Sequence, residues 1–183
     1  AGWLKYWWAF LALERVNSPE DLKKLSREEL IVLAQDIRDA MLHRVSNKGG
    51  HVGPDFGAVE LIIALHKVFN SPVDKFVFDV SHQCYPHKII TGRKFGFLDL
   101  DRYLEVSGYT NQDESEHDFF KIGHTSTSVS LATGLAKARD LRGVKENIIA
   151  IIGDGSLSGG EAFEGLNVAS ELNTNMIIIA NDN

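Results

Sequence analysis

Residues 148–183 read IIAIIGDGSLSGGEAFEGLNVASELNTNMIIIANDN, and this stretch decides the predicted fold. Its two apolar runs, 148–152 and 176–180, contain no polar alternation, which is typical of strands that are covered on both faces. A helix is predicted between them, over residues 161–171. Because a strand, a crossover helix and a second strand form a βαβ unit, we predict an α/β fold with a parallel sheet and helices on both faces.

The segments before this stretch carry further helix and strand signals. Ser18-Pro19 and the capping-box pattern that starts at Ser26 are typical of helix starts. Residues 91–121 are polar, irregular and rich in turn residues, so a surface excursion is expected there. The other predicted elements are helices at 30–45, 56–69 and 127–141 and a strand at 76–80.

Composition limits the class of protein and of partner. A chain of 183 residues can bury a core of its own, and its 19 basic against 25 acidic residues give a net charge of −6. That balance argues against nucleic acid or an anionic membrane as a partner. Cys84 is the only cysteine, which fits a reducing compartment such as the cytoplasm.

The first residues differ from the rest of the chain. Residues 1–13 hold all three tryptophans and are too short to span a bilayer. We interpret them as a leader foreign to the domain, with a membrane-surface anchor as the less favoured alternative. The domain is therefore expected over residues 14–183.

Polar residues follow both apolar runs of the quoted stretch. Gly153-Asp154-Gly155 comes after the first run, and Asn181-Asp182-Asn183 after the second. Ligands of parallel sheets bind at the carboxyl ends of strands, so Asp154 and Asn183 are expected to meet if the two strands are neighbours. Carboxylate and amide oxygens suit Mg²⁺, and glycines let the backbone approach a diphosphate. Taken alone, Asp-Gly after a strand is more often ordinary turn chemistry.

Several histidines lie at predicted loops or element ends, most of them beside glycine or proline. They are His51, His82, His87 and His124. A histidine in such a place can bind phosphate or move a proton, although any single one is more often structural. A zinc site at His82, Cys84 and His87 is disfavoured because no second pair of ligands matches it.

Longer stretches resemble one enzyme family. They are KGGHVGPDFGAVELIIALHKVFNSPVDK (48–75), SHQCYPHKIITGR (81–93), SGYTNQDESEHD (107–118), GHTSTSVSLATGLAKARDL (123–141) and GDGSLSGGEAFEGLN (153–167). Over residues 14–183 the chain resembles the 1-deoxy-D-xylulose-5-phosphate synthase family of transketolase-like thiamine-diphosphate enzymes. The resemblance implies a transketolase-like, thiamine-diphosphate-binding fold of which this chain is the incomplete N-terminal part.

The resemblance also implies an activity. Pyruvate would condense with glyceraldehyde 3-phosphate, with loss of CO₂, to give 1-deoxy-D-xylulose 5-phosphate for isoprenoid and thiamine synthesis. The implied cofactors are thiamine diphosphate and Mg²⁺, and the implied assembly is a homodimer in the cytoplasm. Two alternatives stay open: a transketolase-like enzyme with another ketol donor, and a non-catalytic α/β module for dimerisation or ligand sensing.

The family's residue roles carry over motif by motif. The resemblance implies metal ligands at Asp154 and Asn183 and proton transfer or substrate orientation at His51 and His82. The implied cofactor contacts are His82, Gly123, His124, Thr125, Gly155, Ser156 and Asn183.

Some positions depart from the family pattern. Ser81 stands where the family usually has glycine, and Pro54-Asp55 replaces a small polar pair. The glutamate that protonates the cofactor's aminopyrimidine ring belongs to a second domain in this family. We therefore expect the chain to be the leading part of a longer enzyme and to be inactive by itself.

Overall fold

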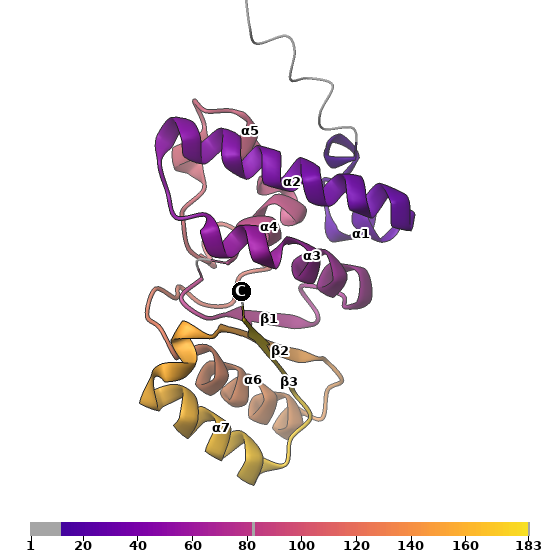
Figure 1. The fold of residues 1–183 in the computed structure, drawn as a ribbon. Coiled ribbons are helices and arrows are strands. Elements are labelled where there is room, and N and C mark those ends of the chain that lie inside the picture. Colours follow the sequence, from indigo (N-terminus) through magenta and orange to yellow (C-terminus); the bar gives the residue numbers. More distant parts are fainter. Residues whose placement is uncertain (1–11, 82, 183) are drawn as a thin grey trace, which may run out of the picture. The chain divides into compact units, whose positions relative to one another are not determined.

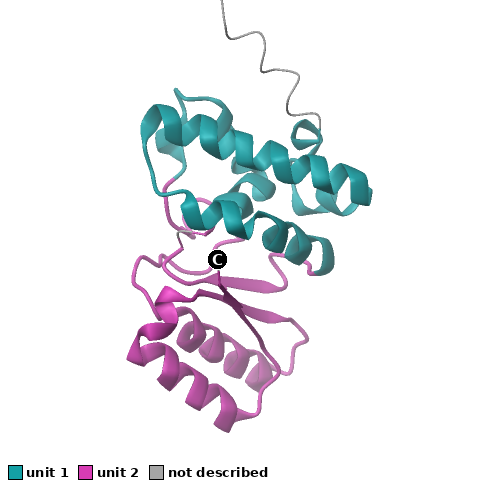
Figure 2. Ribbon diagram, in the orientation of Figure 1, with its two compact units in different colours: residues 1–68, 85–106 teal, residues 69–84, 107–183 magenta. Residues whose placement is uncertain are grey.

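The structure, a computed structural model, describes residues 12–81 and 83–182. Residues 1–11 of the predicted leader, His82 and Asn183 lie outside this part. The described chain divides into two compact units (Figure 2). Unit 1 holds the described residues of 1–68 and 85–106, and unit 2 those of 69–84 and 107–183. The sequence gives no sign of this division, because each unit is assembled from two separate segments.

Unit 1 is helical (Figure 1). Its elements are η2 (Leu13–Arg15), α1 (Pro19–Lys23), α2 (Arg27–Lys48), α3 (Gly53–Val68), α4 (Tyr85–Lys88), η3 (Ile89–Arg93), α5 (Phe95–Leu98) and η4 (Tyr103–Glu105), where η marks short 3₁₀ or π turns. The predicted irregular stretch 91–121 thus includes brief helical turns.

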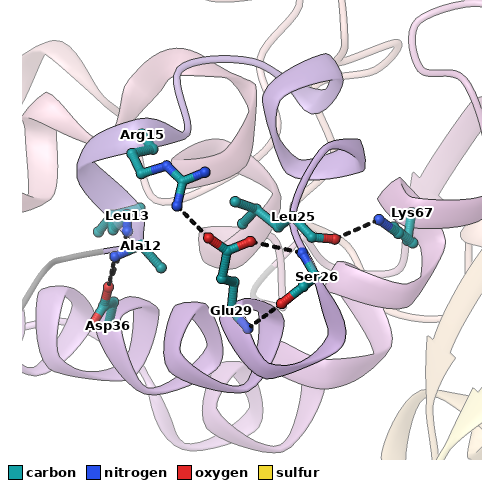
Figure 3. Close-up of polar contacts among 8 residues, drawn as sticks. All are labelled: Ala12, Leu13, Arg15, Leu25, Ser26, Glu29, Asp36 and Lys67. Atoms are coloured by element: carbon teal, nitrogen blue, oxygen red, sulfur yellow. Dashed lines mark hydrogen bonds and ion pairs between the residues drawn. The ribbon is translucent and has the colours of Figure 1, made fainter.

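Polar contacts fasten the N-terminal end of unit 1 to its long helices (Figure 3). The predicted capping box at the start of α2 is confirmed: the Glu29 N–H donates to Ser26 Oγ, and the Ser26 N–H donates to Glu29 Oε2 at 2.8 Å. Asp36 Oδ2 accepts from the main-chain N–H groups of Ala12 and Leu13, both at 3.0 Å. Because Asp36 is almost fully buried, these bonds replace the water that its carboxylate gives up.

Burial in α2 and α3 follows the apolar spacing read from the sequence. Ile37 and Met41 of α2 and Ile62 of α3 are fully buried. Helix α3 begins at Gly53, three residues earlier than predicted, because Pro54 fits the first turn of a helix. The apolar spacing over 56–69 also predicts that Val68 is buried. This prediction is wrong, because the Val68 side chain, at the end of α3, is 67% exposed.

Unit 2 contains a three-stranded parallel sheet in the order β1-β2-β3. Its elements are β1 (Lys75–Phe78), α6 (Ser128–Arg142), β2 (Ile148–Gly153), η5 (Gly155–Ser158), α7 (Gly160–Leu172) and β3 (Ile177–Asn181). The register pairs Phe78 with Ile151 and Gly153 with Asn181. The predicted α/β fold and parallel sheet are therefore confirmed.

The core of unit 2 lies between the sheet and the two helices α6 and α7 (Figure 1). Alternate residues of β2, at 148, 150 and 152, belong to this cluster. Small side chains such as Ala132 and Ala136 let α6 approach the strands closely, and α7, which carries Ala162, packs against α6. Among residues 12–81 and 83–182, no helix has both the length and the apolar character that a bilayer span needs.

Candidate functional site

Two predicted loops open at the carboxyl edge of the unit 2 sheet. β2 and β3 are parallel neighbours, and the Asp154 N–H donates to the Asn181 carbonyl at 3.1 Å. The sequence-based expectation that these loops share one edge is confirmed. Asp154 is exposed, so its carboxylate is accessible to a metal ion. Asn183, the second predicted metal ligand, lies outside the described residues, so its convergence with Asp154 stays a prediction.

The loop after β2 presents open space on one side and packs on the other. Among residues 12–81 and 83–182, and apart from its two chain neighbours, no heavy atom lies within 4 Å of the position that a Cβ on Gly155 would take. Ser156 is buried, and its carbonyl accepts a 2.6 Å hydrogen bond from Ser126 Oγ. A Cβ on Gly159 would overlap that same hydroxyl, so a glycine is required there. Of the two predicted contacts in this loop, Gly155 faces the open side and Ser156 anchors the loop.

Asp79, which follows β1 directly, holds the loop that precedes α6. Its Oδ1 accepts from the Ser126 N–H at 2.8 Å and its Oδ2 from the Ser128 N–H at 2.9 Å. Both bonds are buried, and the carboxylate lies where the positive end of the α6 dipole favours negative charge. Sequence reasoning missed this residue because the predicted strand 76–80 includes it, whereas β1 ends at Phe78 and leaves Asp79 in the place that Asp154 has after β2.

The anchored loop carries three of the predicted cofactor contacts. Gly123, His124 and Thr125 are all exposed. His124 Nδ1 lies 2.8 Å from the Thr125 carbonyl, which can only accept, so Nδ1 carries a proton. This leaves His124 Nε2 as the ring nitrogen available to a ligand. Together, Asp79 and Ser126 bring this loop and the Asp154 loop to one edge of unit 2.

The backbone after Asp79 is strained. Val80 and Ser81 both adopt left-handed φ angles, 56° and 74°, which are rare for residues with a side chain. The buried Ser81 hydroxyl lies 2.7 Å from Thr110 Oγ1 and donates to the Ile122 carbonyl at 3.0 Å. A glycine would adopt this conformation without strain, whereas serine offsets part of the cost with these bonds. His82 follows directly and lies outside the described residues.

His51 belongs to unit 1, in the loop that joins α2 to α3. Its side chain is exposed, and Gly49 and Gly50 before it have φ angles of 77° and 140°. These backbone conformations explain why two glycines precede the histidine. The predicted site residues of unit 2 and His51 are thus each placed within their own unit.

Among residues 12–81 and 83–182, no group of three or more histidine, cysteine, aspartate or glutamate side chains is placed to hold a metal ion. Mg²⁺ needs no such group, since it binds through one or two carboxylates with phosphate oxygens and water. Zinc at residues 82–87 stays disfavoured, because His87 Nδ1 is 2.9 Å from His66 Nε2 in the interior of unit 1.

Known proteins that are similar to this chain share one description. Residues 13–183 match the family model described as 1-deoxy-D-xylulose-5-phosphate synthase. Curated relatives of that name include those of Carboxydothermus hydrogenoformans, 51% identical over 171 residues, and Desulfitobacterium hafniense, 52% identical over 171 residues. A third, from Dictyoglomus turgidum, is 51% identical over 173 residues. These matches cover 93–94% of this chain but only 27–28% of each relative's length.

Proposed function

The chain belongs to the 1-deoxy-D-xylulose-5-phosphate synthase family, and from this premise we propose the activity of the complete protein. It condenses pyruvate with glyceraldehyde 3-phosphate, with loss of CO₂, to give 1-deoxy-D-xylulose 5-phosphate. Its cofactors are thiamine diphosphate and Mg²⁺. The identity of about half of all positions across nearly the whole chain supports this choice over a transketolase-like enzyme with another donor.

One observation about unit 2 supports the cofactor proposal most directly. The loop of Asp154 and Gly155 and the loop of His124 are tied together at one edge of the sheet by the Ser126 to Ser156 hydrogen bond. This edge offers an exposed carboxylate, a histidine and the unhindered backbone of Gly155. Such donors fit a metal-bound diphosphate, because Mg²⁺ prefers oxygen ligands and phosphate accepts hydrogen bonds from N–H groups.

Each residue has a defined task in this proposal. Asp154 supplies a carboxylate oxygen to Mg²⁺, and Asn183 supplies a second ligand. His124 orients a phosphate or substrate oxygen, while His51 and His82 hold or move protons near the reacting carbonyl. When bound, thiamine diphosphate supplies a nucleophilic carbon and an electron sink. The roles of His82 and Asn183 are supported by their motifs alone.

A labelling experiment on the complete protein tests the activity. Release of CO₂ from carboxyl-labelled pyruvate is measured with and without glyceraldehyde 3-phosphate, and we expect release to depend on the aldehyde, on thiamine diphosphate and on Mg²⁺. Release that ignores the aldehyde would reassign the acceptor. Activity with xylulose 5-phosphate but none with pyruvate would reassign the donor. No turnover and no cofactor binding would favour a non-catalytic module.

A matched pair of variants tests the metal ligand. Asp154→Ala should abolish Mg²⁺-dependent binding of thiamine diphosphate in isothermal titration calorimetry. Glu164→Ala removes another exposed carboxylate, from α7 of the same unit, and this variant should bind the cofactor normally. Equal binding by both variants would remove Asp154 from the site.

We also propose a cytoplasmic homodimer for the complete protein. The lone, buried Cys84 is compatible with a reducing compartment. Analytical ultracentrifugation across a range of concentrations tests the dimer, and a monomer at all concentrations would contradict it.

A further inference from the structure

We propose that Asp55 and Tyr85 form a brace that positions the loop of His51, residues 49–52, for the reaction. Neither residue is a predicted cofactor or substrate contact, and both belong to unit 1. This inference rests on the proposed function, since it assigns to His51 a role in moving a proton or orienting substrate.

The two contacts of the brace lie on either side of His51 in the sequence. Asp55, in the first turn of α3, accepts a 3.0 Å hydrogen bond at Oδ1 from the Tyr85 N–H. The hydroxyl oxygen of Tyr85 lies 3.7 Å from the position that a Cβ on Gly50 would take. The main chain of Tyr85 therefore holds the residue four positions after His51, and its side chain lies against the residue just before it.

The partner on α4 is itself fixed in place. The Tyr85 and Phe97 rings pack edge to face, with centroids 5.2 Å apart. The Arg44 guanidinium lies 5.4 Å from the Tyr85 centroid and 4.6 Å from that of Phe97, and its Nη2 donates to the Val106 carbonyl at 2.7 Å. Cation–π contacts and a charge-assisted hydrogen bond restrict the tyrosine ring, so the brace is stiff.

A buried carboxyl group at position 55 lowers the stability of the folded protein. Asp55 is fully buried, and among the described residues its Oδ2 has no hydrogen-bond partner. Burial raises the pKa of Asp55 to about 8, against the lowering effect of the Tyr85 N–H, so the carboxyl group is mostly protonated at neutral pH. Local rules of stability are broken most often where function requires it. The geometry indicates that the function of Asp55 is to accept the hydrogen bond of the Tyr85 N–H.

The test uses the complete enzyme and three variants. Asp55→Ala removes the acceptor, and Asp55→Asn keeps a neutral acceptor of the same shape. Ile62→Val, at a fully buried position further along α3, is the control for lost stability. Measured for each are kcat, KM for pyruvate, the Kd of thiamine diphosphate and hydrogen exchange of residues 49–56.

We expect Asp55→Ala to lower kcat about tenfold or more, because small misplacements of a reacting group are costly. Its Kd for thiamine diphosphate should change little, and exchange of residues 49–56 should rise. Asp55→Asn should restore both kcat and protection, and Ile62→Val should leave kcat unchanged. An Asp55→Ala enzyme with unchanged kcat and exchange, or an Asp55→Asn enzyme as impaired as the alanine variant, would overturn the brace.

If the proposed function is wrong, the same experiment gives a result that can be distinguished from failure of the brace. A wild-type enzyme without aldehyde-dependent decarboxylation refutes the activity, and hydrogen exchange then decides on the brace alone. Faster exchange of residues 49–56 in Asp55→Ala, but not in Ile62→Val, supports it. Equal exchange in the two variants refutes it.

Discussion

Replacing Asp55 by asparagine should change how the stability of the protein depends on pH. The carboxyl group is fully buried, and burial raises its pKa from the ordinary 3.8 to about 8. Between these two values the folded protein keeps the proton that the unfolded chain has lost. The free energy of unfolding contributed by Asp55 is therefore fully present below pH 3.8 and is lost as pH rises toward 8.

The size of the effect follows from that shift. It spans about 4 pH units, and each unit corresponds to about 1.4 kcal/mol. Between pH 5 and pH 7 the wild-type protein should thus lose about 3 kcal/mol relative to Asp55→Asn, which has nothing to ionise. The unpaired amide of asparagine costs about 1–3 kcal/mol, but this cost does not depend on pH. If the 183 residues unfold cooperatively, each kcal/mol shifts Tm by about 2–4 °C. The difference in Tm between Asp55→Asn and the wild type should therefore grow by roughly 6–12 °C from pH 5 to pH 7.

Thermal melts of the wild-type protein and the variant at pH 5, 6, 7 and 8 measure this difference. Asp101→Asn removes one carboxylate from an exposed position of the same unit and controls for the change in net charge. The difference between the Tm of this variant and that of the wild type should be the same at all four pH values. If the Asp55→Asn curve also runs parallel to the wild-type curve, then Asp55 is ionised in the folded protein and the reasoning is wrong.

Three further substitutions test contacts in each unit. Asp79→Ala leaves two buried N–H groups unpaired and should lower the free energy of unfolding by about 2–4 kcal/mol in denaturant titrations, whereas an effect below about 1 kcal/mol would mean that water replaces the carboxylate. Gly159→Ala should lower the free energy of unfolding by about 1–3 kcal/mol, because the new Cβ overlaps the Ser126 hydroxyl. Adding Ser126→Gly should recover most of this loss, since it removes the overlapping hydroxyl and a serine with a left-handed φ angle. Losses that simply add in the double variant would contradict this coupling. Asp36→Ala frees the N–H groups of Ala12 and Leu13, so limited proteolysis should cut near residue 13 faster than in the wild type, and an unchanged rate would show that other contacts hold this end.

The part of the fold that the sequence predicts best is the part that depends on local pattern. The apolar runs 148–152 and 176–180 gave the neighbouring strands, and Ser26 gave the capping box. The division into two units was missed, because it depends on contacts between residues far apart in the chain. Val68 was misplaced because helical spacing identifies a face but not where along a helix burial ends.

The candidate site shows the same limit. A polar residue after a buried strand led to Asp154, and the loop with His124 was found through its motif. Asp79 was overlooked because its partners, the N–H groups of Ser126 and Ser128, are backbone atoms that no side-chain pattern reveals. Asp55 was noticed only as a departure from the family pattern. Its burial and its bond to Tyr85 depend on tertiary packing.

The interleaving of the two units has a consequence for synthesis on the ribosome. The polypeptide passes from one unit to the other at residues 68/69, 84/85 and 106/107. β1 ends at Phe78 and its first partner strand begins at Ile148, so about 70 residues must be translated before the two can pair. At about 5–20 residues per second, the nascent β1 waits roughly 4–14 s with its apolar residues unpaired. A chaperone that binds apolar segments of nascent chains is therefore expected to bind this segment during that interval.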